Sequence, residues 1–120
     1  MAPRPCPCGL QKTYADCCGR FHRGEAAATT AELLMRSRYS AFSVGDEAYL
    51  LRTWHPDVRP QRVGLDRKVR WTGLEVLETT GGSPFHTEGT VHFRAHSSDG
   101  VVEENSKFTR FQGAWVYCGT

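Results

Sequence analysis

Four cysteines are crowded into the first part of this 120-residue chain. They form a Cys-x-Cys pair and then, after eight further residues, an adjacent Cys-Cys pair, at Cys6, Cys8, Cys17 and Cys18. Zinc favours thiolate ligands, and four of them complete a tetrahedral site with no position left for a substrate. The spacing therefore predicts a structural zinc site, in which the metal supplies folding energy to a segment that is too short to bury a core.

Other interpretations of this segment stay open. The cysteines could be free thiols or a labile disulfide, and His22 could replace one of them as a ligand. Residues 11–18 could make two helical turns that return the second cysteine pair to the first. The segment also has a basic rim, which is either simply solvated or contacts an acidic partner or RNA phosphates. This rim consists of Lys12, Arg20, His22 and Arg23.

The composition is that of a globular protein, with 39% hydrophobic and 23% charged residues. No apolar run is long enough to cross a bilayer, and no apolar signal segment precedes Cys6, so we expect a cytoplasmic protein without a membrane partner. In a reducing compartment a tight cysteine cluster favours a metal over disulfides. Four thiolates and one Zn²⁺ would bring the formal net charge of +2 to about 0, so nucleic acid is not an expected partner.

Arg38 is the second residue that could do chemistry. It lies in residues 30–44, which we predict to be a helix, because Thr29 and Glu32 have capping-box spacing and Gly45 can end the helix in a left-handed conformation. Helical periodicity places Arg38 in the middle of an apolar face, with Leu34, Met35, Tyr39, Ala41 and Phe42. A guanidinium keeps its charge, so Arg38 needs a carboxylate, a bound anion or an opening to water, unless its head simply reaches the surface.

A second, shorter helix is expected to follow. Asp46 is a suitable N-cap, and Pro56 prevents the helix from continuing past Trp54. His55 would then lie at the helix C-terminus, where it either caps the last carbonyls or faces a ligand as an acid or base.

The second half of the chain alternates apolar and polar residues with period two. Strands are expected at 69–79, 89–96, 101–111 and 114–118, with a bulge at Gly73 and short turns between the strands. Helices followed by strands that short turns connect predict an α+β fold with an antiparallel sheet.

Strand parity suggests a partner for Arg38. Glu104 shares a strand face with Phe108, so both point inward if Phe108 belongs to the core. An Arg38–Glu104 pair could be a buried structural bridge, the polar floor of a ligand pocket, or a means of positioning Glu104 as a catalytic base, although the arginine would weaken that base. The predicted pocket residues are Arg38, Tyr39, Trp54, His55, Glu104 and Trp115, with core packing as the alternative role of Trp115.

Parts of the chain resemble one known motif and one known protein family. The stretches Cys-Pro-Cys-Gly and Tyr-Ala-Asp-Cys-Cys-Gly resemble the SEC-C zinc motif, in which the zinc ligands correspond to the four clustered cysteines. The stretches 35–42, 49–51 and 53–56 resemble the YchJ family of small bacterial proteins. This resemblance implies a SEC-C-like zinc knuckle over residues 1–25 and a nuclear transport factor 2-like (cystatin-like) domain over residues 26–120. The implied domain is a cone, with helices packed in the concave face of a curved antiparallel sheet. Many members of the family carry a second SEC-C motif after the sheet, which these 120 residues do not include.

Two classes of function follow from these features. The first is a bacterial binding module, in which the zinc knuckle contacts a protein partner and the cone holds a small molecule. The second is an enzyme of the dehydratase or isomerase type, for which Arg38, His55 and Glu104 would be the catalytic candidates. We favour binding, because the chain has neither a glycine-rich phosphate loop nor a nucleophile elbow. The oligomeric state does not follow from the sequence.

Overall fold

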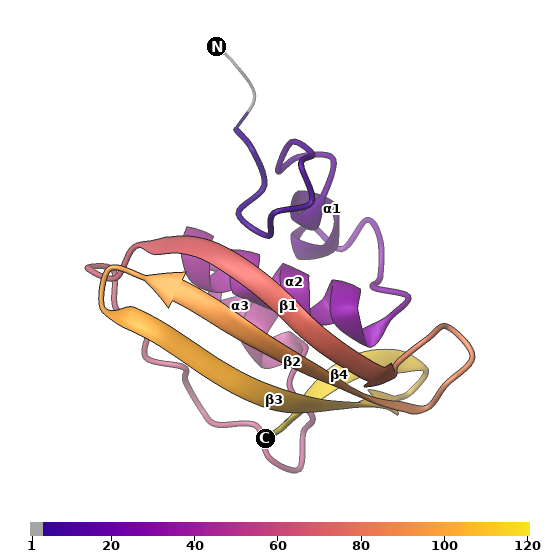
Figure 1. Cartoon of the computed structure of the whole chain (residues 1–120). Coiled ribbons are helices and arrows are strands. Elements are labelled where there is room, and N and C mark those ends of the chain that lie inside the picture. Colours follow the sequence, from indigo (N-terminus) through magenta and orange to yellow (C-terminus); the bar gives the residue numbers. More distant parts are fainter. Residues whose placement is uncertain (1–3) are drawn as a thin grey trace.

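The computed structural model describes residues 4–120, which form three helices and a four-stranded antiparallel sheet (Figure 1). The helices are α1 (Cys18–His22), α2 (Ala31–Val44) and α3 (Glu47–Arg52), and the strands are β1 (Trp71–Gly81), β2 (Glu88–Ser97), β3 (Gly100–Phe111) and β4 (Ala114–Gly119). Helices thus precede strands, and the predicted α+β class is confirmed.

The N-terminal segment of residues 4–25, called the knuckle below, is built mainly from turns. Pro5 and Thr13 form an isolated antiparallel bridge, and the amide of Cys6 donates to the carbonyl of Lys12 at 2.8 Å. Gln11 has a φ of 60°, which an α-helix excludes. The helical turns expected over residues 11–18 are therefore not formed, and α1 begins only at Cys18.

Helix α2 is the element against which both the knuckle and the sheet pack. Its N-cap is Thr30, so the predicted capping box that starts at Thr29 is displaced by one residue. Glu32 accepts a hydrogen bond from Arg36 at 3.0 Å rather than returning to the N-cap. Gly45 ends the helix with a φ of 79°, in the left-handed conformation expected from the sequence.

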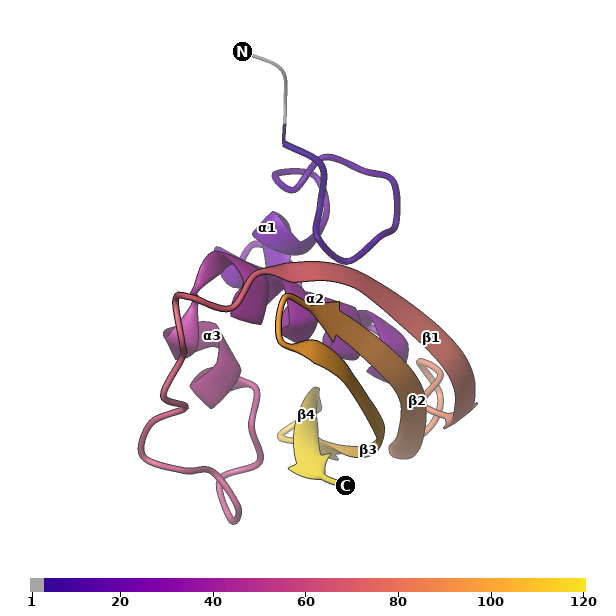
Figure 2. The same cartoon turned by 60° about the vertical axis from the view of Figure 1, so that its left-hand side comes forward.

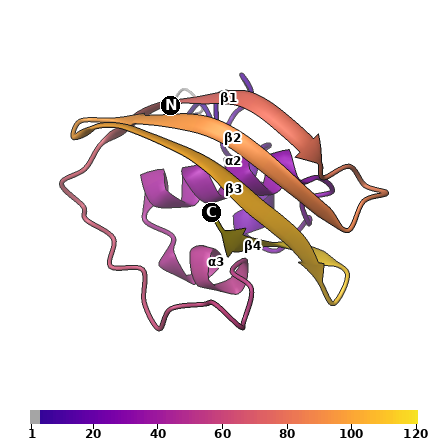
Figure 3. The same ribbon diagram turned by 60° about the horizontal axis from the view of Figure 1, so that its bottom comes forward.

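Helix α3 begins at the predicted N-cap, since Asp46 accepts from a backbone amide of the first turn at 3.0 Å. It ends at Arg52, earlier than expected, and residues 53–70 then run as a long connection around the outside of α3 (Figure 3). Two backbone N–H groups of this connection donate to the carboxylate of Glu47, which holds the loop against the helix.

The strands pair in the order β1-β2-β3-β4. The register shifts within the Trp71–Gly73 and Val76–Glu78 stretches of β1, and the first of these is the predicted bulge at Gly73. Bulges bend a strand and increase its twist. Figure 2 shows the result, a sheet curved like a shell with α2 on its concave side.

The main core lies between α2 and the inner face of β2, β3 and β4. Its buried residues are Ala31, Leu34, Met35, Tyr39, Val91, Phe93, Ala95, Phe108 and Trp115. The outer face of the sheet is charged, and Glu103 accepts there from Arg94 at 2.6 Å and from His92 at 2.9 Å. None of the helices in the described part of the chain combines the length and the apolar character needed to span a membrane.

Candidate functional site

The four clustered cysteines converge in the knuckle. Their Sγ atoms all lie within 4.8 Å of one another, all four residues are buried, and the Sγ atoms of Cys8 and Cys17 are 3.6 Å apart. A tetrahedral zinc site with Zn–S bonds of ~2.3 Å places its sulfurs about 3.8 Å apart. The donor set and its size therefore fit one metal ion. The fifth cysteine, Cys118, is half-buried on β4 and lies outside the cluster.

The electrostatics of the cluster also favour a cation. Hydrogen bonds from Cys18 and Cys8 lower the pKa of the Cys6 thiol below its ordinary value. The same contacts, first with Cys6 and then with Cys8, raise the pKa of Cys18 above its ordinary value, and burial adds to this effect. A thiolate on Cys6 thus disfavours a second thiolate beside it. Four buried thiolates at this spacing need a positive ion among them.

Local geometry explains how the two cysteine pairs meet. Gly9 follows the first pair with a φ of 86°, so the chain turns directly after Cys8. Gly19 follows the second pair and donates its amide to the carbonyl of Tyr14 at 2.8 Å. A Cβ at position 19 would lie 2.6 Å from that carbonyl oxygen, so glycine is required at this close approach.

Helix α2 supports the cluster from outside. The hydroxyl of Ser40 lies 3.5 Å from Sγ of Cys6, and Nη1 of Arg36 donates to the carbonyl of Cys8 at 2.7 Å. Ser40 is fully buried. Contacts of this kind orient metal ligands and adjust their basicity. The sequence reasoning missed both residues, because a contact between segments so far apart in the chain has no local signal.

His22 is not part of the cluster. Its Nε2 lies 2.8 Å from the carbonyl of Ser37 and its Nδ1 lies 2.5 Å from the hydroxyl of Tyr14. Because a carbonyl only accepts, Nε2 donates to Ser37, while Nδ1 and the hydroxyl of Tyr14 share the second hydrogen bond. The ring also packs against Tyr49, with centroids 4.5 Å apart. His22 therefore links the knuckle to α2 and α3 rather than joining the cysteine cluster.

A cavity of about 340 Å³ lies between α2, the start of the connection after α3, and the inner face of the sheet. Most of its wall is aromatic or aliphatic. The lining residues are Met35, Arg38, Tyr39, Phe42, Trp54, Trp71, Phe93, Ala95, Val102, Glu104, Ser106, Phe108 and Tyr117. Parity along β3 accounts for several of these, because Val102, Ser106 and Phe108 share the face of Glu104, and β2 pairs Phe93 with Glu104.

Arg38 is the charged residue of α2 at this cavity, and it is only 6% exposed. Its Nη1 donates to the carbonyl of Leu50 at 2.8 Å and to Oγ1 of Thr53 at 2.7 Å. The guanidinium carbon lies 5.0 Å from the ring centroid of Trp54 and 4.7 Å from that of Tyr117. Burial lowers the pKa of Arg38 to about 10, so it remains a cation at neutral pH.

The predicted Arg38–Glu104 ion pair is wrong. Within residues 4–120, no nitrogen of Arg38 lies within 4.0 Å of a carboxylate oxygen of Glu104. Glu104 does face inward and lines the same cavity, but its one side-chain hydrogen bond in the described chain comes from Ser106, at 3.3 Å. The carbonyl of Leu50, in the last turn of α3, takes the place of the carboxylate, because terminal carbonyls carry partial negative charge.

Tyr39 also lines the cavity. Its hydroxyl is buried and has no hydrogen-bond partner at normal geometry in the described part of the chain. Burial raises the pKa of Tyr39, while the neighbouring amide of Gly73 opposes that rise. The hydroxyl oxygen is thus a buried polar group within the wall and is not exposed to the cavity.

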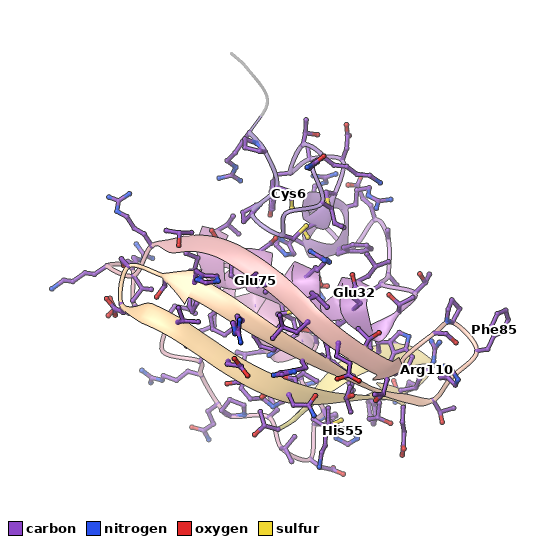
Figure 4. The ribbon with its side chains drawn as sticks, viewed as in Figure 1. Cys6, Glu32, His55, Glu75, Phe85 and Arg110 are labelled. Atoms are coloured by element: carbon purple, nitrogen blue, oxygen red, sulfur yellow. The ribbon has the colours of Figure 1, made fainter. Side chains whose placement is uncertain are left out.

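His55 and Trp115 do not line the cavity, and for Trp115 the structure shows the alternative role, core packing. The ring of His55 packs against Phe111, with ring centroids 5.3 Å apart. Its Nδ1 accepts a hydrogen bond from the amide of Asp57, so this nitrogen does not cap a carbonyl at the end of the helix. Trp115 is buried in the core and donates its Nε1–H to the carbonyl of Thr29 at 3.1 Å. In Figure 4, His55 and Cys6 lie on opposite sides of the molecule.

The comparisons with known proteins agree with this geometry. Residues 5–20 match the model of the SEC-C motif, and residues 30–120 match the model described as YchJ, middle NTF2-like domain. A UPF0225 protein of Streptomyces coelicolor is 62% identical over 117 residues, which cover 98% of this chain and 94% of that protein. A UPF0225 protein of Deinococcus radiodurans is 42% identical over 119 residues, which cover 95% and 86%.

Two solved structures have the same fold. The solution structure of a SEC-C motif containing protein from Rhodopseudomonas palustris has a TM-score of 0.76 at 29% identity, over 96% of this chain and 95% of that one. The crystal structure of a SEC-C motif containing protein from Psychrobacter arcticus has a TM-score of 0.76 at 27% identity, over 96% and 80%. With a cysteine cluster, a curved sheet and relatives of this similarity, the chain belongs to the YchJ (UPF0225) family, whose members join a SEC-C motif to a nuclear transport factor 2-like domain.

Proposed function

We propose that the protein is a zinc-stabilised binding module that takes up a small organic molecule in its cavity. The observation that carries this proposal is Arg38, a buried cation at the wall of an apolar cavity and without a carboxylate partner in the described chain. Burying an unpaired charge costs free energy. Such a cost is explained if the charge serves to bind something.

Zinc is the metal that the donor set favours. Four thiolates in a small tetrahedral cage suit zinc better than a hard cation such as Mg²⁺ or Ca²⁺. Four protein ligands leave no open coordination position, so the role is structural. The cluster is also the centre of its own small core, against which the partly buried hydrophobic residues Leu10 and Tyr14 pack. Zinc retention by thiolates suits a reducing compartment, and we therefore place the protein in the cytoplasm.

A protein partner at the knuckle is the second part of this proposal. The predicted basic rim is partly engaged within the knuckle, since Arg23 donates to Glu25 and to the carbonyl of Ala15. Arg20 lies over the ring of Phe21 and donates to the carbonyl of Cys17. Because these arginines make contacts within the knuckle, they are less available for phosphate, and we propose a protein rather than RNA as the partner at the knuckle.

An enzyme of the dehydratase or isomerase type is the alternative. Two of the three catalytic candidates, Arg38 and Glu104, do share the cavity, while His55 does not. The half-buried carboxylate of Glu104 could accept a proton from a bound molecule. Glu104→Gln separates the two functions, because it would abolish turnover but leave the cavity and its occupant in place.

Native mass spectrometry of the protein, purified without added metal or chelator, tests the proposal. We expect one zinc ion per chain and a small-molecule adduct that collisional activation releases. The same measurement on Arg38→Lys should retain the zinc and lose most of the adduct. A preparation with no metal would overturn the zinc part, and metal-loaded protein in which no small molecule binds, either as purified or on addition, would overturn the cavity part.

A further inference from the structure

We infer that the cavity takes a small aromatic or alicyclic carboxylic acid, with its carboxylate on the Nε–Nη2 edge of Arg38 and a hydroxyl or amino group near Glu104. This inference rests on the proposed function and names the class of ligand. It follows from three features of the cavity wall: the open edge of Arg38, the flat apolar lining, and the acid that shares the space.

The Nε–Nη2 edge of Arg38 indicates which charged group the ligand carries. Both hydrogens of Nη1 are used, one on the carbonyl of Leu50 and one on Oγ1 of Thr53. Nε and Nη2 have no partner in residues 4–120, and together they form the side of a guanidinium that binds a carboxylate through two parallel hydrogen bonds.

The orientation of that edge is fixed before any ligand arrives. The guanidinium carbon packs against the aromatic pair of Trp54 and Tyr117, at 5.0 Å and 4.7 Å from the ring centroids, and those centroids are themselves 5.1 Å apart. Thr53 is held in turn by donating to the carbonyl of Tyr49 at 2.8 Å. A preorganised donor pair loses less entropy when it binds. Arg38 is therefore better suited to a planar carboxylate than a mobile surface arginine would be.

The apolar residues that line the rest of the cavity indicate the size and shape of the ligand. Trp71, Phe93 and Phe108 present rings or ring edges to the cavity, and Met35 can adapt its shape to a guest. A cavity of about 340 Å³ is at the lower end of the usual range for ligand pockets, which is ~300–1,000 Å³. These features fit a compact, largely apolar ligand with one ring or a short branched chain.

Glu104 indicates a second polar group on the ligand, besides its carboxylate. A carboxylate bound to Arg38 would share a small apolar space with the carboxylate of Glu104, and two like charges repel there. A hydroxyl or amino group on the ligand turns this repulsion into a hydrogen bond, and the hydroxyl of Ser106, which donates to Glu104, lies beside it. Inorganic phosphate is a poor fit, because its second charge would face Glu104 without a second cation.

The test uses the zinc-loaded full chain and matched probes. We would titrate benzoate, 4-hydroxybenzoate, benzamide, 4-hydroxybenzamide and inorganic phosphate, and follow the Nε–H of Arg38 and the indole N–H signals of Trp54 and Trp71 by NMR. We expect both carboxylates to bind at least about tenfold more tightly than the matching amides, and 4-hydroxybenzoate more tightly than benzoate. Amides that bind as tightly as the acids would overturn the ligand class and leave the proposed cavity function intact. If no probe shifts these signals, the inference fails as well; the proposed function fails separately if the native mass spectrum also shows no adduct.

Two variants assign the effect to residues. Arg38→Lys keeps the positive charge but removes the pair of parallel N–H donors of the guanidinium. The affinity for the carboxylates should fall about tenfold, while the affinity for the amides should not change. Arg94→Lys, on the outer face, is its control and should change nothing. Equal loss for acids and amides in Arg38→Lys would mean that the variant only disturbs the cavity.

Glu104→Gln provides an independent check, should Arg38→Lys not fold. Without the negative charge, benzoate should bind more tightly and the advantage of 4-hydroxybenzoate over benzoate should shrink. Glu103→Gln makes the same charge change on the opposite face of the strand and serves as the control. An unchanged ranking of the two acids in Glu104→Gln would contradict the role of Glu104.

Discussion

The hydroxyl of Ser40 lies 3.5 Å from Sγ of Cys6 and connects the knuckle to the middle of α2. Arg38 and Tyr39, its neighbours in the sequence, point to a different face of the same helix and line the cavity. One helix therefore supports both the cysteine cluster and the cavity. Whatever changes the position of α2 acts on both.

Loss of one cysteine of the cluster should remove the metal. Cys8→Ser is expected to abolish stoichiometric zinc and to lower the free energy of unfolding by more than ~3 kcal/mol, because metal binding supplies the folding energy of the knuckle. Metal analysis and chemical denaturation measure the two effects. Cys118→Ser, outside the cluster, is the control and should keep both zinc and stability. Equal zinc content in the two variants would contradict the assignment of the ligands.

Ser40→Ala should weaken the metal site without removing a ligand. A metal-bound thiolate can only accept, so the Ser40 hydroxyl donates to Cys6, and losing such an outer contact costs roughly 10–100-fold in metal affinity. Competition with a chromophoric chelator gives the affinity. Ser43→Ala, at an exposed position of the same helix, should match the unmodified protein. Should both variants compete equally well with the chelator, the contact has no effect on the metal.

Glu104→Ala should lower the stability of the protein only slightly. Breaking a buried ion pair costs about 3–5 kcal/mol, whereas Glu104 has only a 3.3 Å hydrogen bond from Ser106 to lose. We expect the free energy of unfolding to fall by less than about 1 kcal/mol, measured by urea denaturation. A loss in the range of a broken pair would show that Arg38 and Glu104 do pair in solution.

Gly89→Ala should strongly destabilise the protein. A Cβ at position 89 would lie 2.5 Å from the Cα of Gly82, and backbone cannot move aside as a flexible side chain can. The expected loss is roughly 2–3 kcal/mol or more, with a lower Tm. Gly73→Ala is the matched glycine in the adjacent strand, where nothing lies within 4 Å of the added Cβ, and it should be nearly neutral. Equal melting temperatures for the two variants would be inconsistent with the close approach at Gly89.

Glu103 should titrate below the ordinary carboxyl range. The hydrogen bond from Arg94, followed by that from His92, lowers the pKa of Glu103 from its usual 4.5. A carboxyl whose pKa is lower in the folded state adds stability above the unfolded pKa and loses it as the pH falls through the folded value. The side-chain carboxyl signal in an NMR titration reports this directly. In Arg94→Gln the pKa should move back up, and a pKa that did not move would mean that the pair is not formed in solution.

Local features of the sequence predicted much of the fold. The left-handed cap at Gly45, the N-cap at Asp46 and the bulge at Gly73 each depend on one residue and its immediate neighbours. Strand parity correctly placed Glu104 on the inner face together with Phe108, because side chains alternate strictly along a strand. Resemblance to known motifs then supplied the family and the curvature of the sheet.

The sequence by itself determined the four-cysteine cluster and the inward direction of Arg38, because both depend on spacing within one short segment. Only the tertiary structure decided the partners of Arg38, the role of His22 and the exclusion of His55 from the cavity. Parity and periodicity give the face on which a side chain lies, but not the atom that it reaches. That atom depends on how α2, α3 and the sheet pack together, and the carbonyl of Leu50 met the guanidinium where a carboxylate had been expected.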